Sequence, residues 1–276
     1  MQRHIHGPRT GRSVPANNPA PLMISDPWFY AVALPAMLLV GMSKGGLGSV
    51  GLLVVPIMAI TIPPIQAAGI VLPILILSDI VAVISYRNTF DRRTLRIMLP
   101  GAMVGIALGW LTAAWVSEDH IRLVVGVVAV LFALRYWLAG ARHGQPAAHA
   151  RLRGGFLGMM SGFTSFLTHA GGPPYQMYVV PLRLKPRSYA GTHVMMFATV
   201  NAVKLVPFFF LGQFDATNLA TSAALLPVSL PATLLGIWLV RRIDTDRFYR
   251  FIYVLMLTVG VYLIGAAVSS LVSTPA

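Results

Sequence analysis

The sequence predicts an all-α polytopic membrane protein with two inverted repeats, each a glycine-broken helical hairpin followed by three transmembrane helices. Composition is the first observation behind this prediction: 56% of the 276 residues are hydrophobic and only 11% are charged. A typical soluble protein has about 25% charged residues. The second observation is a series of apolar stretches of membrane-spanning length, and the third is a pair of glycine-rich interruptions. Because a soluble chain of this length needs a charged surface that is missing here, we exclude a water-soluble fold.

Apolar stretches of about 20 residues are long enough to cross the hydrocarbon core as a helix. The predicted spans are 65–86, 97–117, 123–134 with its flanking residues, 188–211, 217–240 and 251–276. Two of these spans also hold ionisable or amide side chains, namely Asp79 in the first and Asn201 and Lys204 in the fourth. Because ionisable groups at membrane depth are costly and usually functional, we interpret these three residues as candidates for coupling transport to another ion.

Two further apolar segments, 28–63 and 154–182, are too long for one crossing and are broken in the middle. The breaks read Gly41-Met-Ser-Lys-Gly-Gly-Leu-Gly48 and Thr168-His-Ala-Gly-Gly-Pro-Pro174. Glycine runs and paired prolines do not continue a regular helix. We therefore expect two helical hairpins whose arms meet at non-helical backbone, which a membrane tolerates only where protein buries it or where it lines a cavity.

Positive charges predict the orientation of the chain. Most of its 21 lysine and arginine residues gather in four connections, around 87–96, 135–153, 183–187 and 241–250, whereas the links at 117–120 and 212–218 carry acidic residues and no lysine or arginine. The positive-inside rule places the four basic connections in the cytoplasm, so that the net charge of +13 reflects topology and indicates no nucleic-acid partner. We expect a multi-pass protein of the cell (plasma or inner) membrane. If the first hairpin returns to its own side, the N-terminus lies outside, although the arginines of the tail disagree with the rule; residues 1–26, rich in Pro, Gly and Asn, are expected to be disordered.

An internal repeat is predicted from landmarks that recur about 125 residues apart. Val54-Val55-Pro56 recurs as Val179-Val180-Pro181, Lys44 falls on His169, and Asp79 falls on Lys204. We expect a first membrane repeat over 27–140, a cytoplasmic linker over 141–153 and a second repeat over 154–276. Because each repeat has an odd number of crossings, the second is inverted relative to the first, as in many secondary transporters.

The two breaks together predict a binding site for a small anion. Free backbone N–H groups and helix dipoles at broken helices attract anions, and glycine lets the backbone approach a ligand. The predicted substrate-binding residues are Ser43, Lys44, Gly45, Gly46, Gly48, Thr168, His169, Gly171 and Gly172. Lys44 either reaches the membrane interface or pairs with Asp79, and such a pair would itself be a coupling element.

Other polar and small residues are interpreted as structural. His193, Gln66 and Gln176 are expected to support the fold, and Gly101, Gly105 and Gly109, spaced by four, to allow close helix packing.

Catalysis finds little support in the sequence. The chain has no cysteine, and Asp79 is the one acidic residue deep in a span, so we predict no metal site, no cofactor and no enzyme. Gly41 to Gly45 matches Gly-x-Ser-x-Gly, and Gly46 to Gly51 matches the dinucleotide fingerprint. Both patterns require a preceding strand that is not expected here.

The residues of the two breaks also carry a family resemblance. GMSKGGLGSVGLLVVP at 41–56 and GMMSGFTSFLTHAGGPPYQMYVVPL at 158–182 resemble the duplicated glycine-rich signature of the TauE/SafE sulfite exporter family. The similarity extends over nearly the whole chain after Pro27. It implies a polytopic transporter of small sulfur-containing anions without a cofactor, with Gly45, Gly46, Gly48, Gly171 and Gly172 at the core of the site.

The leading hypothesis is a secondary transporter of sulfite or an organosulfonate that works by alternating access, with Asp79 or His169 coupling the movement to protons. The expected partners are the small anion and the lipid bilayer, and a homo-oligomer stays possible. One alternative is a channel or carrier for a different ion, cations included, which Asp79 with Asn201 would favour. Another is a membrane-embedded enzyme or assembly factor that does not transport.

Overall fold

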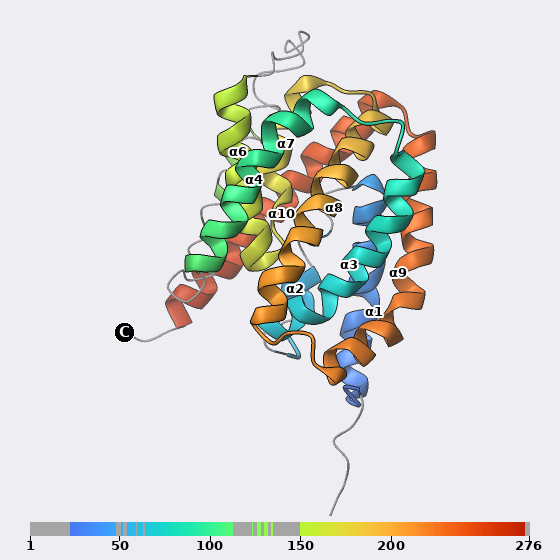
Figure 1. Cartoon of the computed structure of the whole chain (residues 1–276), viewed down its shortest axis with the longest axis vertical. Coiled ribbons are helices and arrows are strands. Elements are labelled where there is room, and N and C mark those ends of the chain that lie inside the picture. Colours follow the sequence, from blue (N-terminus) through green and yellow to red (C-terminus); the bar gives the residue numbers. More distant parts are fainter. Residues whose placement is uncertain are drawn as a thin grey trace, which may run out of the picture.

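Helices make up the regular structure of this chain (Figure 1). The computed structural model describes residues 23–47, 51, 54–58, 60–62, 64–112, 123, 126, 127, 130, 131, 134 and 150–273, and these contain no strand. The elements are α1 (Pro27–Met42), η1 (Ser43–Leu47), α2 (Val54–Met58), α3 (Pro64–Tyr86), α4 (Arg92–Thr112), α6 (Arg151–Thr168), α7 (Gly172–Val179), η4 (Val180–Leu182), α8 (Pro186–Phe210), α9 (Ala216–Arg242) and α10 (Thr245–Ser273). The all-α fold class is thereby confirmed.

Five helical segments are long and apolar enough to cross a membrane. They are Pro27–Gly46, Gln66–Tyr86, Arg92–Thr112, Pro186–Phe210 and Ala216–Arg242. The last four overlap the spans predicted from the sequence. The first corresponds to the N-terminal arm of the first predicted hairpin. The predicted span 123–134 falls mostly outside the described residues, as do most of the tail 1–26 and of the linker 141–153. The chain is therefore a multi-pass membrane protein.

Three helices, α4, α6 and α10, begin three to six residues earlier than the sequence suggested. The Asp91 carboxylate accepts hydrogen bonds from the backbone N–H groups of Arg93 and Thr94, so α4 starts at Arg92 rather than at the predicted residue 97. Because a capped N-terminus satisfies donors that the first turn leaves free, the helix extends through its basic residues. α6 likewise begins earlier, at Arg151, three residues before the predicted start of the second hairpin, but without a side-chain cap.

Both predicted breaks are present as interruptions of helices. After α1 the chain makes a π-type turn in which Gly46 has a φ of 119°, a conformation that favours glycine. After α6, His169 is left-handed with a φ of 55°, and α7 starts at Gly172 followed by Pro173 and Pro174. Proline is tolerated there because the first turn of a helix needs no N–H donors.

Glycines bring two pairs of helices into close contact. A Cβ at Gly101 or Gly105 of α4 would overlap the carbonyl oxygens of Gly155 and Met159 on α6. A Cβ at Gly41 of α1 would likewise overlap Ser229 of α9. In both pairs the contacts advance together along the two chains, so α1 runs parallel to α9 and α4 runs parallel to α6. The predicted packing role of Gly101, Gly105 and Gly109 is confirmed.

α3 and α8 contact each other in the interior of the bundle. Both helices carry buried polar side chains, among them Asp79 on α3 and Asn201 and Lys204 on α8. The two breaks contact these helices, η1 against both α3 and α8, and α6 against α8. The broken segments and the two polar helices thereby meet in one region.

Candidate functional site

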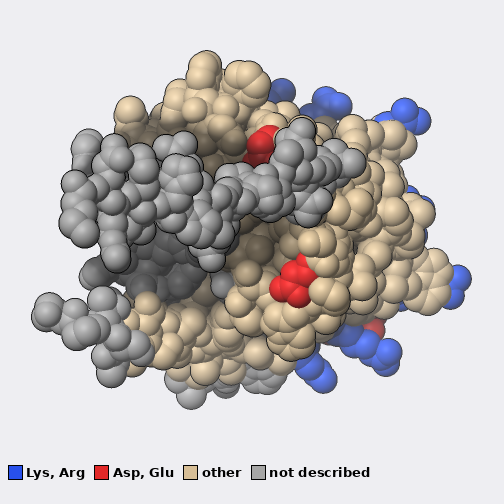
Figure 2. All heavy atoms as spheres, turned by 90° about the horizontal axis from the view of Figure 1, so that it is seen from below, with Lys and Arg blue, Asp and Glu red and all other residues tan. Residues whose placement is uncertain are grey.

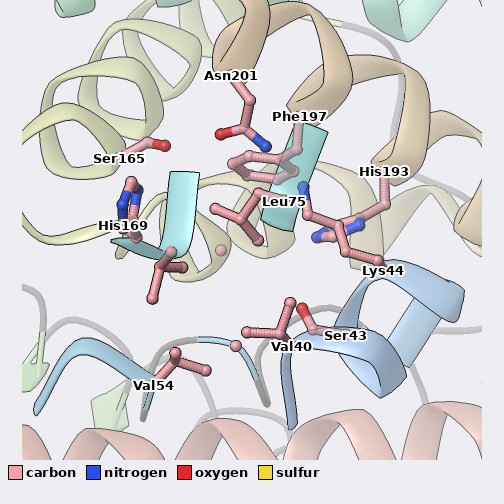
Figure 3. A pocket seen from close by; sticks show the side chains of 13 residues that line it. Val40, Ser43, Lys44, Val54, Leu75, Ser165, His169, His193, Phe197 and Asn201 are labelled. Atoms are coloured by element: carbon pink, nitrogen blue, oxygen red, sulfur yellow. The ribbon is translucent and has the colours of Figure 1, made fainter. Parts of the chain in front are cut away.

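A cavity of about 50 Å³ lies between the two breaks (Figure 3). A cavity needs roughly 10–15 Å³ of accessible volume to hold one water molecule, so this cavity has room for a ligand of a few heavy atoms. Ser43 and Lys44 lie on one side of the cavity, and Ser165 and His169 on the other. The lining residues are Val40, Ser43, Lys44, Gly51, Val54, Val71, Leu75, Ser165, His169, Gly172, His193, Phe197 and Asn201.

The first break contributes a buried ion pair beside this cavity. Lys44 Nζ lies 2.7 Å from Asp79 Oδ1, and both side chains are buried. The other carboxylate oxygen, Oδ2, accepts a hydrogen bond of 2.7 Å from the Asn201 amide. This pairing, rather than a reach of Lys44 to the membrane interface, is what the structure shows. Because Lys44 neutralises this carboxylate and Asn201 donates to its Oδ2, Asp79 does not present a free ligand to a cation.

The second break has a corresponding contact with α8. Lys204 Nζ lies 2.7 Å from His169 Nδ1 and also donates to the carbonyl and the hydroxyl oxygen of Ser165. When Lys204 carries its ammonium charge it has only donors, so Nδ1 accepts and the His169 proton lies on Nε2, which is 3.4 Å from the Ala68 carbonyl oxygen. This tautomer is the uncharged form of the ring. Lys204 is fully buried, and within the described residues no carboxylate forms an ion pair with it.

Each break thus places a basic residue against a polar side chain of the neighbouring long helix, and the cavity lies between the two contacts.

The family model for sulfite exporter TauE/SafE matches residues 33–263, which run from α1 to α10. The chain belongs to the TauE/SafE family. No curated protein and no solved structure matches it. The resemblance seen in the glycine-rich breaks is confirmed, and membership of a transporter family favours transport over catalysis.

Not all glycines of the TauE/SafE signature in this chain face the cavity. Gly172 lines it, whereas a Cβ at Gly45 would lie against Gly236 of α9 and one at Gly46 would lie 2.5 Å from the Cβ of Ala190 on α8. A Cβ at Gly171 would lie 2.6 Å from the Phe197 ring. These three glycines allow the breaks to fit tightly against neighbouring helices. Gly48 and the side chain of Thr168 lie outside the described residues.

The backbone donors of the second break are fewer than its glycines suggest. A helix N-terminus leaves its first N–H groups without intrahelical partners, but Pro173 and Pro174 at the start of α7 have no N–H to offer. The donors at this end are therefore restricted to Gly171 and Gly172. As a result, the side chains of Lys44, Ser43 and Ser165 provide much of the polar lining.

Sequence reasoning missed two polar lining residues of this TauE/SafE protein, His193 and Ser165. His193 was interpreted as structural, but it is buried in the cavity wall. Its Nδ1 has no hydrogen-bond partner within the described part of the chain. The spacing offered a signal, because His193, Phe197, Asn201 and Lys204 recur every three or four residues and so share one face of α8. Ser165 similarly lies one turn before His169.

Proposed function

We propose that this TauE/SafE family protein is a secondary transporter that moves sulfite or a small organosulfonate by alternating access. One observation carries the proposal: the described residues that line the cavity between the two breaks include the basic residues Lys44, His169 and His193 and no acidic residue. Asp79 balances Lys44, whereas Lys204, which is buried against His169, has no carboxylate partner within the described residues, so any positive charge that it carries is uncompensated. Because an uncompensated buried charge is costly, an anion in the cavity would stabilise this arrangement.

The contacts between the two halves support the inverted repeat that alternating access requires. If α1 and α6 are equivalent, as are α4 and α9, then the parallel α1–α9 and α6–α4 contacts are one interface that occurs twice. The same equivalence relates Lys44–Asp79 to His169–Lys204. Transporters with such repeats place their substrate where the halves meet, and the halves rock about it.

Proton coupling follows from the position of Asp79. An anion that takes Lys44 as its partner leaves the buried Asp79 carboxylate with Asn201 alone. A proton on Asp79 would remove that unpaired charge, so the anion and a proton would be carried together. Asp79 is therefore our candidate for the proton-carrying group.

The test is flux of labelled sulfite and of a labelled organosulfonate into proteoliposomes, with a pH-sensitive dye inside. Replacing the pair by neutral groups of similar size, Lys44→Met with Asp79→Asn, should lower anion flux at least about tenfold, since the loss of a charged hydrogen bond costs roughly 1.5–3 kcal/mol. Asp79→Asn alone should leave anion flux measurable but abolish the proton movement that accompanies it.

The matched control is Lys185→Met, because Lys185 is an exposed lysine at the start of α8 and is not among the residues that line the cavity. It should transport like the unaltered protein. An unchanged anion flux in the Lys44→Met, Asp79→Asn protein would rule out the assigned site. Flux of an inorganic cation, with none of sulfite or sulfonate, would rule out the function.

A further inference from the structure

Four arginines converge on a cleft that is separate from the central cavity. The cleft has a volume of about 670 Å³ and is lined by Arg92, Arg93, Arg96, Ile97 and Arg151. Three of the arginines come from the start of α4 and the fourth from the start of α6, and all four are exposed. By the positive-inside rule this end of the two helices faces the cytoplasm.

Helix geometry makes this convergence unfavourable without an anion. The close glycine contacts hold α4 and α6 parallel, so their N-termini, each with a partial positive charge, lie at the same end. Neither helix has an acidic residue in its first turn, and the residue before α6, Ala150, provides no side-chain cap. Asp91 caps α4 and supplies one negative charge against four positive ones. The cleft therefore concentrates positive charge from two sources.

Topology signals alone do not account for this arrangement, as another basic connection shows. At the end of α9 and the start of α10, Arg241 donates to the Ser85 carbonyl oxygen, Arg242 lies 4.4 Å from the centre of the Trp238 ring, and Arg247 pairs with Asp244. In the cleft, Arg92 lies over the Phe90 ring. Within the described residues, none of the four cleft arginines forms an ion pair with a carboxylate. The positive-inside rule requires arginines on this side, but it does not require four of them around one space.

Exposed apolar side chains follow the cleft residue Arg151 along α6. Leu152 is 90% exposed and Phe156 is 56% exposed, and they lie one turn apart beside Arg151. A bilayer-facing surface with arginines at the headgroup level and apolar side chains below it fits an amphiphile. Arginine also matches phosphate oxygens with two parallel hydrogen bonds.

We propose that this cleft binds the phosphate headgroup of an anionic phospholipid in the predicted cytoplasmic leaflet, with the acyl chains along Leu152 and Phe156. Basic pockets between transmembrane helices on this side of a membrane are suited to such headgroups. The proposal is independent of what the central cavity transports.

The test is thermal unfolding of the purified full-length protein in neutral detergent, titrated with phosphatidylglycerol, phosphatidylcholine or inorganic phosphate. Phosphatidylglycerol should raise the unfolding midpoint to a plateau, whereas phosphatidylcholine and inorganic phosphate at equal concentration should not. Arg93→Gln with Arg96→Gln should weaken the phosphatidylglycerol effect roughly tenfold or more. The matched control, Arg241→Gln with Arg242→Gln, removes two arginines from the same predicted side and should leave it unchanged.

A second pair of substitutions, Arg93→Lys with Arg96→Lys, keeps the charge but loses the paired hydrogen bonds. It should therefore weaken phosphatidylglycerol binding less than the glutamine variant does. It also provides the test if the glutamine variant does not fold. Equal weakening by the cleft and control variants would mean general attraction to an anionic surface and would overturn the site. An unchanged phosphatidylglycerol response in the cleft variants would also overturn it. The same midpoint rise with inorganic phosphate would replace the lipid by a free anion.

Discussion

Lys44 and Asp79 join the first break to α3 through two charges inside the bundle. A buried pair contributes little net stability, because desolvation offsets the attraction, but the removal of one partner leaves an uncompensated charge. The pair therefore restricts which single substitutions the site tolerates. His169 is also constrained, since its left-handed backbone caps the end of α6 and its ring contacts Lys204.

We expect Lys44→Met to lower the free energy of unfolding by about 3–5 kcal/mol, because Asp79 is then buried without its counter-ion. Adding Asp79→Asn should restore most of that loss, since a neutral amide replaces the unpaired carboxylate. Thermal unfolding in mild detergent measures both variants, with Lys185→Met as the exposed control. If the double variant is as unstable as Lys44→Met, the ion pair is not the reason for the loss.

Single residues of the site were predictable to different degrees. Lys44, Asp79, His169 and Lys204 stand out because ionisable groups are rare in apolar segments. His193 is also ionisable and lies in the span 188–211, but its position near the helix end is equally compatible with a structural role, so that only its spacing with Asn201 and Lys204 pointed to the site. Its contribution to the lining depends on how α8 is rotated against the breaks, which is a property of packing.

At the level of whole helices, small residues determine how closely the elements approach. Gly101 and Gly105 allow the backbone of α6 to lie directly against α4. The four-residue spacing predicted this use, because it places the glycines on one helix face. The spacing did not identify which helix packs against these glycines. That this helix is α6 is known only from the tertiary structure. The helix starts at Arg92 and Arg151 were also missed, since hydropathy does not register a polar first turn.

We predict that Gly105→Ala destabilises the protein by about 1–3 kcal/mol, because the new Cβ overlaps the Met159 carbonyl and must push the two backbones apart. Gly265→Ala in α10 is the matched control, as a Cβ there meets nothing within 4 Å. The shift of the unfolding midpoint in detergent compares the two. Equal midpoints would show that the α4–α6 contact is not tightly packed.

At the scale of the whole molecule, charge differs between the two ends. Because α1 and α9 run parallel, Asp26 and Asp215, which cap their N-termini, lie at one end of the bundle. Figure 2 looks onto the lower end of Figure 1, where acidic groups are visible on the face and basic groups are confined to the margins. The predicted outer location of the N-terminus conflicts with the basic tail but agrees with this parallel pairing.

The absence of cysteine makes a direct test of orientation possible. Single substitutions Ser25→Cys and Ala216→Cys, both at exposed positions, should react with a membrane-impermeant thiol reagent in intact cells. Asn88→Cys, exposed between α3 and α4, should react only after permeabilisation. Reaction of Ser25→Cys from the opposite side to Ala216→Cys would contradict the parallel pairing of α1 and α9 in the membrane.

The sequence by itself determined that the chain enters the bilayer, where its helices break and which family it belongs to. These properties follow from local chemistry: apolar length, glycine and proline in the backbone, and charges that are costly in lipid. Only the tertiary structure decided which groups meet. It pairs Lys44 with Asp79 and Lys204 with His169, and it places His193 in the cavity wall. It also brings four arginines from two helices to one cleft. In each case the residues that meet are distant along the chain. Their positions depend on helix packing, which no local pattern specifies.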